Sequence, residues 1–410
     1  MTNIPNLEGK FRSDIPARFN ELNALEQHYL RFLATKEGAI VPPYEVLIHP
    51  SSICNLACAW CIGEHVPVSN EPDALNISTK FKEQGRLPDT MANPEAMLRV
   101  IDDILSYTMT VEVAGGHREF RVENVSFSGL IGEPLVAKKA VTAAMRRLAD
   151  NNRRVGIFTN GLLIDDSVME VLMGIAYVHI SVDAGTPETY ANLKARNCTK
   201  LSELPKAWKV IEAIAERKRN TGSGLDINCS YIMYPENFRE IYEAAKALKG
   251  CGCEILRIKQ DNSGNRLLSQ NEAAEAEFLL QRIQAELVDD GFKVVTLHKL
   301  GMTSAPVRQF SKCRITELMA AVGSDGCLYP CNYHPRPNGA SYGSAIELGF
   351  KEVWESSVRS MMKKQIPSIC PAVCDPFKGR ANNLLEIADR EVDRLGHVEF
   401  LDQVHSIVNK

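Results

Sequence analysis

Three cysteines near the start of the chain have the spacing of ligands to one metal centre. Cys54, Cys58 and Cys61 form a Cys-x-x-x-Cys-x-x-Cys pattern directly after an apolar run at 44–48. Thiolates so close in sequence can converge on a single metal, whereas cysteines that only pack in a core have no need to cluster. A closed structural zinc site requires four ligands. A 4Fe–4S cluster held by three thiolates leaves one iron open for another molecule, so the pattern favours a catalytic iron–sulfur centre.

A second set of cysteines lies near the other end of the chain. Its members are Cys313, Cys327, Cys331, Cys370 and Cys374. Glycine and proline are frequent around them, and no long helical pattern begins before residue 353. Four thiolates can close one metal site, either an iron–sulfur cluster or a structural zinc site. We therefore expect a small metal-binding domain at 301–380, followed by a helical segment at 381–410.

The composition is that of an ordinary globular protein without a strong global charge. The chain has 410 residues, 45% of them hydrophobic and 24% charged, with a formal net charge of −4. This charge offers no basic field for nucleic acid or an anionic membrane, and no apolar run approaches the ~20 residues of a membrane span. The first residues lack the features of a secretory signal. The 12 cysteines therefore indicate a reducing cytoplasmic compartment and metal binding rather than disulfides.

The elements that must position these cysteines alternate between strand and helix. Strands are expected at 44–49, 122–128, 154–159, 177–182, 225–233 and 254–259, with helices at 93–106, 134–150, 166–173, 201–219, 238–249 and 270–289. Such alternation predicts a parallel sheet with helices outside it in a core at 44–300, without deciding between an open sheet and a partial barrel. Before this core, residues 1–43 form an N-terminal extension with one amphipathic helix at 17–35.

Glycines and polar residues follow several of the expected strands. Phe-Ser-Gly-Leu-Ile-Gly-Glu-Pro at 127–134 follows the second strand, an Asn-Gly pair at 160–161 follows the third, and Ser-Val-Asp-Ala-Gly at 181–185 ends the fourth. Each segment also fits an ordinary turn, with Pro134 at a first helical position and Asn-Gly as a common turn pair. Because parallel strands end at one edge of a sheet, these segments are expected to lie near the Cys54 loop.

Taken together, the cysteine loop and the strand ends resemble the radical S-adenosylmethionine (SAM) superfamily over residues 44–260. In that family the open iron of the cluster binds the amino and carboxylate groups of SAM. An electron from the cluster then cleaves SAM to methionine and a 5′-deoxyadenosyl radical. The resemblance implies an α/β fold with a partial (β/α)6 TIM-type barrel. It also implies an aromatic residue near the adenine, which here is Trp60.

The resemblance also assigns SAM contacts to residues at the strand ends. The segment at 127–134 is similar to the family's Gly-Gly-Glu motif, whose backbone and acidic side chain hold the SAM ammonium, although Ile131 is an extra residue here. The SAM-binding residues implied in this way are Gly129, Glu133, Asn160, Ser181, Asp183 and Arg196. Arg196 is expected to pair with the SAM carboxylate because a guanidinium binds a carboxylate through two hydrogen bonds, and Lys194 is the alternative.

The C-terminal cysteines resemble the SPASM and shorter twitch domains of the same superfamily. This resemblance implies an auxiliary 4Fe–4S cluster with Cys313, Cys331, Cys370 and Cys374 as ligands. Cys327 is the spare cysteine and can replace Cys331 in this set. Five cysteines are fewer than a full SPASM domain uses, so we expect a twitch-like domain.

Four further residues are candidates for contact with the substrate. Cys229 lies in the fifth strand and Cys251 just before the sixth, and a thiol there can donate a hydrogen atom to a substrate radical. A buried cysteine is more simply an inert apolar residue. Arg257 and Lys259 end the sixth strand and can face the substrate, although strand ends are commonly polar.

The expected activity is hydrogen abstraction from a small polar substrate such as a sugar or an aminocyclitol. Oxidation or dehydrogenation is favoured over epimerisation or dehydration, because five cysteines serve the C-terminal domain. No peptide-recognition module is recognisable before Tyr44 or after Ala381, so a ribosomal-peptide maturase is the alternative. A non-catalytic cysteine-rich metal-binding protein is the alternative of another class. Flavodoxin or ferredoxin is the expected electron donor.

Overall fold

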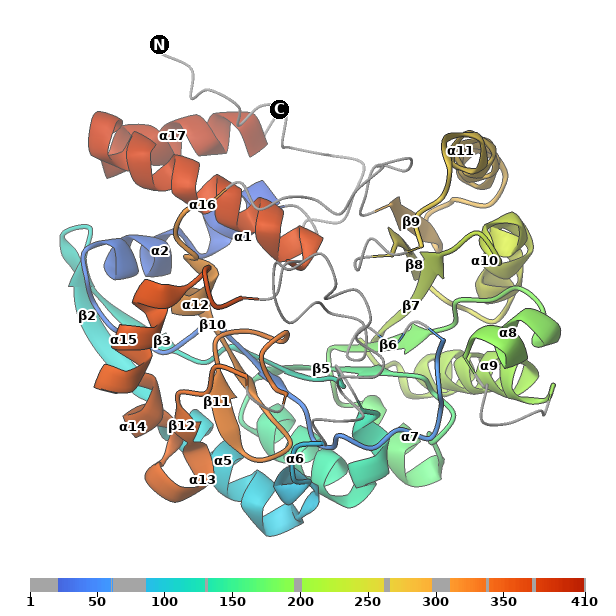
Figure 1. Ribbon diagram of the computed structural model, residues 1–410, viewed down its shortest axis with the longest axis horizontal. Coiled ribbons are helices and arrows are strands. Elements are labelled where there is room, and N and C mark those ends of the chain that lie inside the picture. The colour runs from blue at the N-terminus through green and yellow to red at the C-terminus, as the bar shows by residue number, and fades with distance from the viewer. Residues whose placement is uncertain are drawn as a thin grey trace.

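A ten-stranded, mostly parallel sheet forms the centre of the structure (Figure 1), a computed structural model that describes residues 21–59, 61, 86–129, 132–194, 201–261, 266–296, 310–336, 339–370 and 374–408. The strand order is β12-β11-β10-β1-β4-β5-β6-β7-β8-β9. The six central strands are β1 (Glu45–Ile48), β4 (Asn124–Phe127), β5 (Arg154–Thr159), β6 (Tyr177–Ser181), β7 (Asp226–Met233) and β8 (Ile255–Gln260). They are the six expected strands, and neighbours pair in parallel. The expectation of an α/β fold with a parallel central sheet is confirmed.

Four short strands extend the sheet at its two ends. β9 (Lys293–Thr296) pairs in parallel with β8. At the other end β10 (Met319–Val322) pairs in parallel with β1, and β11 (Cys327–Tyr329) and β12 (Gly343–Ser344) follow in antiparallel order. The sequence pattern does not indicate these strands, because two to four residues are too few to show alternation. The cysteine-rich C-terminal segment thus adds three strands to the sheet that carries the Cys54 loop.

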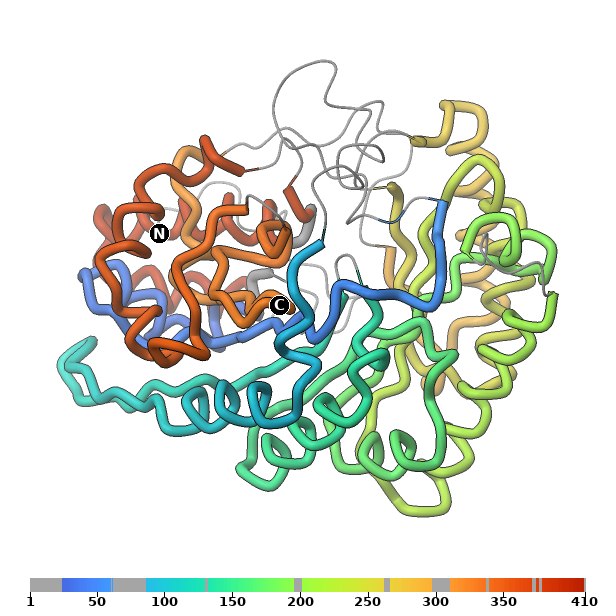
Figure 2. The backbone as a smooth tube through the Cα atoms, turned by 60° about the horizontal axis from the view of Figure 1, so that its bottom comes forward, coloured from blue at the N-terminus to red at the C-terminus, as the bar shows by residue number. Residues whose placement is uncertain are grey.

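Helices cover the outer face of the central strands (Figures 1 and 2). They are α5 (Pro94–Ser106), α6 (Lys138–Asp150), α7 (Asp166–Leu172), α8 (Pro187–Leu193), α9 (Glu203–Thr221), α10 (Ile241–Gly250) and α11 (Gln270–Glu286), with short 3-10 segments η4 (Thr90–Ala92), η5 (Pro134–Ala137) and η6 (Phe238–Glu240). In α5 the Asn93 side chain caps the Glu95 N–H, and Val100 and Ile101 are fully buried on one face. Truncating such a side chain to alanine costs about 2–5 kcal/mol, so this layer fixes the strands and their ends.

Helices from both ends of the chain share a second apolar core. α1 (Glu21–Gln27) and α2 (Tyr29–Lys36) pack with α16 (Pro376–Leu395) and α17 (His397–Val408), and Figure 2 shows the red segments beside the blue ones. Tyr29 stacks on Phe400 with ring centroids 5.7 Å apart. One helix is expected at 17–35, but the structure has two that meet at His28, and residues 17–20 lie outside the described ranges. None of the helices in the described ranges is long and apolar enough to cross a membrane.

The remaining elements connect these layers. They are α12 (Ile315–Leu318), α13 (Ala345–Leu348), α14 (Phe350–Trp354), α15 (Ser357–Gln365), β2 (Thr108–Val113) and β3 (Gly116–Arg121). β2 and β3 form a separate two-stranded hairpin. Its turn residues Ala114 and Gly115 have φ angles of 50° and 73°, the pair of positive values that suits a two-residue hairpin turn.

Candidate active site

The loop that carries the three N-terminal cysteines lies at the C-terminal edge of the sheet, directly after β1. Cys54, Cys58 and Cys61 are all partly buried there. Because the parallel strands end at this edge, the segments that follow β4, β5 and β6 lie near the same loop. Trp60 and Arg196, which are expected near SAM, fall outside the described ranges, as does Ile131, the extra residue of the motif.

Hydrogen bonds hold the backbone of this loop from two sides. The Ser52 N–H donates to the Asp89 carboxylate at 2.6 Å, just before the first cysteine. Further along, the Ala57 N–H donates to the Lys194 carbonyl oxygen at the end of α8, at 3.2 Å. Neither contact uses a thiol, so the loop is fixed while its sulfur atoms stay available as ligands.

The loop after β4 packs directly against the cysteine loop. A Cβ added to Gly132 would lie 2.0 Å from the Ser51 carbonyl oxygen, so this close approach of two backbones requires glycine. The Glu133 N–H then donates to the Ile53 carbonyl oxygen at 2.9 Å. A Cβ on Gly129 would lie 1.7 Å from the Gly132 carbonyl oxygen. The two glycines of the motif therefore serve close packing, which positions Glu133 beside the cysteines.

Glu133 places a buried carboxylate between the ends of β4 and β5. Glu133 is only 3% exposed. Its carboxylate accepts hydrogen bonds from the Thr159 hydroxyl at 2.5 Å and from the Asn160 N–H at 2.8 Å. The Leu135 N–H donates to it at 3.1 Å. Burial raises the pKa of Glu133, and these hydrogen bonds oppose that rise because they favour the charged form.

Asn160 connects the end of β5 to the cysteine loop. Its amide nitrogen donates to the Asn55 side-chain oxygen at 2.8 Å, between the first two cysteines. Its own side-chain oxygen accepts from the Leu162 N–H at 3.0 Å. The structure therefore brings Asn160 to the expected place and engages its side chain in holding the loop.

Asp183 and Lys194 form a buried ion pair after β6. The Asp183 carboxylate accepts from the Lys194 ammonium and from the Ile232 N–H, both at 2.8 Å, and the ammonium also donates to the Ser181 carbonyl oxygen at 2.7 Å. Burial alone lowers the pKa of Lys194, but the Asp183 carboxylate and other neighbours outweigh it and raise this pKa overall. Lys194, the alternative to Arg196, is thus a positive charge held beside the cysteine loop.

The three thiols of the loop are electrostatic neighbours. Burial raises the pKa of Cys58 to about 12, Cys61 and Cys54 add to the rise, and Lys194 opposes it. The Leu56 N–H donates to Cys54 Sγ at 3.4 Å. In the part of the chain that the structure describes, no three His, Cys, Asp or Glu side chains converge as they do around an ion. The donor set of three thiols fits a 4Fe–4S cluster, whose binding displaces the thiol protons.

The C-terminal cysteines line a cavity that is partly open to solvent. Its wall includes Cys313, Cys331, Cys370 and Cys374 together with His334, Asp375 and Lys378. Burial raises the pKa of Cys313 to about 12, and Cys331 adds to the rise. Four thiols are the donor set of either an iron–sulfur cluster or zinc, the two alternatives that the sequence leaves open.

Cys327 lies apart from this wall. It stands on β11 and packs against a small apolar cluster of Leu47, Ala321 and Tyr329. Burial, together with the nearby Asp325 carboxylate, raises the pKa of Cys327 to about 11. The structure therefore brings Cys331, rather than Cys327, to the other three cysteines.

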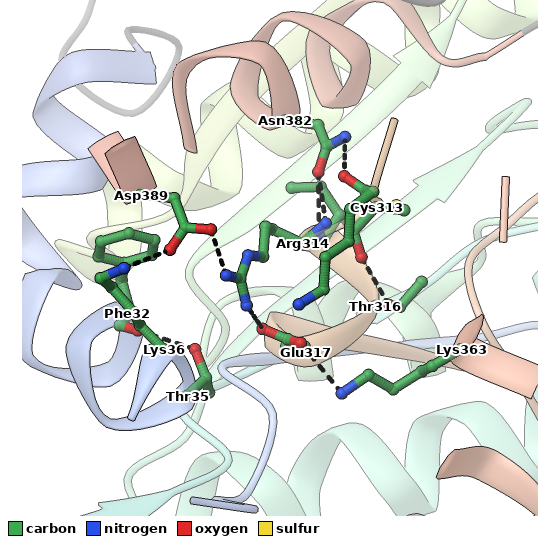
Figure 3. A network of polar contacts seen from close by, with 12 residues as sticks. Phe32, Thr35, Lys36, Cys313, Arg314, Thr316, Glu317, Lys363, Asn382 and Asp389 are labelled. Atoms are coloured by element: carbon green, nitrogen blue, oxygen red, sulfur yellow. Dashed lines mark hydrogen bonds and ion pairs between the residues drawn. The ribbon is translucent and has the colours of Figure 1, made fainter. Parts of the chain in front are cut away.

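A polar network fixes the backbone on both sides of Cys313 (Figure 3). The Asn382 side chain accepts from the Arg314 N–H at 2.6 Å and donates to the Lys312 carbonyl oxygen at 3.1 Å. The Arg314 guanidinium in turn pairs with Asp389 on the same helix as Asn382. α16 thereby holds the Cys313 segment in place, and Asn382 is a positioning residue that no motif in the sequence singles out.

The four candidates for substrate contact do not all lie at the sheet edge that carries the Cys54 loop. Cys229 is fully buried in the main core, where the buried Cys253 is an electrostatic neighbour. Cys251 precedes β8 and thus lies at the N-terminal edge of the sheet, opposite the cysteine loop. Arg257 and Lys259 are partly exposed residues of β8 near its C-terminal end. The structure brings Arg257 and Lys259, but not the two cysteines, toward the edge with the Cys54 loop.

A comparison with protein families identifies the family to which this chain belongs. The family model described as the radical SAM superfamily matches residues 48–254, a range that contains the cysteine loop, Glu133, Asp183 and Lys194. This chain belongs to the radical SAM superfamily. The family implies a 4Fe–4S cluster and SAM as cofactors.

This radical SAM chain is also similar to a curated relative. It is 25% identical over 230 residues to the PqqA peptide cyclase of Granulibacter bethesdensis, which covers 54% of this chain and 49% of that protein. The chain thus matches about half the length of this curated relative.

Solved structures share the fold of this radical SAM chain. SuiB of Streptococcus suis bound to SAM has a TM-score of 0.54 at 15% identity, covering 86% of this chain and 72% of SuiB. SuiB bound to precursor peptide SuiA gives the same TM-score at 14% identity, with 86% and 73% covered. The structure of anSMEcpe with bound AdoMet has a TM-score of 0.50 at 17% identity, covering 87% and 99%.

Proposed function

We propose that this radical SAM enzyme modifies a peptide, with a 4Fe–4S cluster held by Cys54, Cys58 and Cys61. The observation that carries the proposal is the position of these thiols at the sheet edge, beside the buried Glu133 and Lys194. Bound there, the cluster supplies the electron for the reductive cleavage of SAM that the superfamily shares. Glu133 offers a negative charge to the SAM ammonium, and Lys194 a positive charge on the other side of the loop.

The expected small polar substrate, a sugar or an aminocyclitol, is wrong, and a peptide takes its place. One relative is named as a peptide cyclase and a structural neighbour was solved with a precursor peptide. The expectation failed because it rested on the lack of a recognisable recognition module before Tyr44 and after Ala381. A peptide segment needs no such module within the same chain in order to reach the sheet edge. The reaction is therefore proposed as a radical-mediated modification of a peptide.

An auxiliary iron–sulfur cluster in a twitch-like domain is a further part of the proposal. Its proposed ligands are Cys313, Cys331, Cys370 and Cys374, supported by the cavity that these residues line. The proposed domains are an N-terminal extension at 1–43, the SAM-binding core at 44–300, the auxiliary-cluster domain at 301–380 and a helical segment at 381–410. Flavodoxin or ferredoxin is the proposed electron donor, because reductive cleavage consumes an electron.

Anaerobic turnover tests the proposal. Reconstituted protein with dithionite and SAM is expected to form 5′-deoxyadenosine, and the peptide-sized fraction of an extract of the source cells is expected to raise its yield. Protease treatment of that fraction should remove the stimulation. The variant with all three loop cysteines replaced by alanine serves as the control without cleavage. A non-catalytic metal-binding protein would form no 5′-deoxyadenosine with any fraction.

A further inference from the structure

Two cations of β8 face the inner side of the sheet. Leu256 and Ile258 are fully buried in the core beneath the helices. Because successive side chains of a strand point to opposite faces, the alternating Arg257 and Lys259 point to the other side. Pairing with β7 places Lys259 opposite Ile232, near the C-terminal ends of both strands.

Lys259 has charged neighbours from the surroundings of both groups of cysteines. The Ile232 N–H donates to the Asp183 carboxylate, which belongs to the edge with the Cys54 loop. Asp375 and Lys378, which line the cavity of the C-terminal cysteines, are also electrostatic neighbours of Lys259. The charges of Asp183, Asp375 and Lys378 all act on Lys259. A molecule bound at Lys259 is therefore near both groups.

The carboxylates around Lys259 are engaged elsewhere. Asp183 belongs to the buried ion pair described above, and Asp375 caps α16 by accepting the Lys378 N–H at 3.0 Å. Over the described ranges Lys259 itself makes no hydrogen bond or ion pair. Burial, with the charge of Arg257 added, lowers the pKa of Lys259 to about 8. A negatively charged ligand would relieve the cost of keeping this ammonium charged.

We propose that Lys259, assisted by Arg257, binds a carboxylate of the substrate peptide. The proposal deepens the proposed function and rests on a peptide being the substrate. An ammonium and a guanidinium two residues apart on one strand can make charge-assisted hydrogen bonds to a carboxylate. Such bonds hold the peptide in one register between the two groups of cysteines, and positioning of this kind lowers the barrier of the step that follows.

Chemical labelling of Lys259 tests the proposal without measuring turnover. The reconstituted protein with bound SAM is treated with an amine-acylating reagent, and peptide mapping by mass spectrometry gives the labelling rate of each lysine. The probes are acetyl-Gly-Glu-Gly-amide, acetyl-Gly-Gln-Gly-amide and acetyl-Gly-Gln-Gly with a free C-terminal carboxylate. We expect at least one carboxylate probe, but not the neutral one, to slow the labelling of Lys259 about tenfold at saturation. The exposed Lys139 of α6 serves as the reference site.

The three probes also identify the source of the carboxylate. Protection by the glutamate probe assigns a side chain, and protection by the free-acid probe assigns a peptide C-terminus. Equal protection by all three probes, or protection by none, overturns the proposal. Protection that is already complete with SAM alone overturns it as well, because the site then binds the cofactor.

Two variants of Lys259 give a second readout by calorimetric titration of the same probes. Lys259→Arg keeps the charge and should keep the preference for the carboxylate probe, whereas Lys259→Gln should lose it. Unchanged iron content and SAM binding verify that both variants are folded. A preference that survives in Lys259→Gln contradicts the proposal. If carboxylate binding at Lys259 is not found but peptides still stimulate 5′-deoxyadenosine formation, the proposed function stands and only this inference fails. If peptides do not stimulate 5′-deoxyadenosine formation, the proposed function itself fails.

Discussion

The Lys194 ammonium lies 2.8 Å from the Asp183 carboxylate, and the two side chains are only 5% and 13% exposed. Lys194→Met leaves this carboxylate buried without its cation, which is expected to cost about 3–5 kcal/mol of unfolding free energy. Urea denaturation measures the loss. Asp183→Asn keeps the positive φ of 56° and the acceptor for the Ile232 N–H but leaves the buried ammonium without its anion, so it should also cost stability. The double variant, which removes both charges, should cost less than the sum of the two single losses. Losses that simply add in the double variant would contradict the buried pair.

Glu133→Gln removes the negative charge at the end of β4 while keeping the size of the side chain. If this carboxylate binds the SAM ammonium, the dissociation constant of SAM should rise at least about tenfold, because a charge-assisted hydrogen bond is lost. Equilibrium dialysis of reconstituted protein measures the affinity, and the iron content should not change. Glu95→Gln on the exposed first turn of α5 provides the control. Equal SAM affinities in both variants would show that Glu133 has another role.

Cys331 and Cys327 give opposite predictions for the auxiliary cluster. Reconstituted protein should hold about eight irons, corresponding to two 4Fe–4S clusters. Cys331→Ala removes a thiol from the cavity wall and should lower the iron content to about four, whereas Cys327→Ala should leave about eight. Iron analysis together with Mössbauer spectra separates the two cases. Four irons in wild type with zinc at the second site would refute the auxiliary cluster.

Two histidines should make the stability of the fold fall at mildly acidic pH. Burial lowers the pKa of His49 to about 3 and that of His28 to about 4, from an ordinary value of 6.5. Below pH 6.5 the unfolded chain binds protons that the folded chain does not, so stability falls with pH until about 4. Each histidine contributes up to about 1.4 kcal/mol per pH unit. Urea denaturation at pH 7 and pH 5 should show a smaller difference in His49→Gln than in wild type.

Much of the sheet edge is predictable because its signals are local. Apolar runs with helical segments between them predict the six central strands, and the spacing of Cys54, Cys58 and Cys61 predicts their common loop. The glycines at 129 and 132 belong to a motif of the sequence, and the structure shows a close backbone contact at each, of Gly132 with Ser51 and of Gly129 with Gly132. Lys194 lies at the end of α8 beside the cysteine loop, whereas Arg196 falls outside the described residues, so Arg196 as the partner of the SAM carboxylate stays a prediction.

The contacts that escape prediction join segments far apart in the chain. Asn382 holds the backbone beside Cys313 from a helix some seventy residues later, and a single asparagine in a helix carries no signal of that role. β10 pairs with β1 across most of the chain, so its four residues do not reveal their partner. The hairpin at 108–121 does carry a signal, since Met109, Val111 and Val113 alternate with polar residues before a glycine pair.

The fate of the abstracted hydrogen atom tests the central claim most directly. The reconstituted protein, SAM and dithionite are incubated with the peptide-sized fraction of an extract of source cells grown in deuterated medium, and 5′-deoxyadenosine is analysed by mass spectrometry. The proposed peptide modification predicts deuterium in 5′-deoxyadenosine with this fraction and none after the fraction is digested with protease. Deuterium transfer that survives the protease, or that comes instead from the small-molecule fraction, would contradict a peptide substrate.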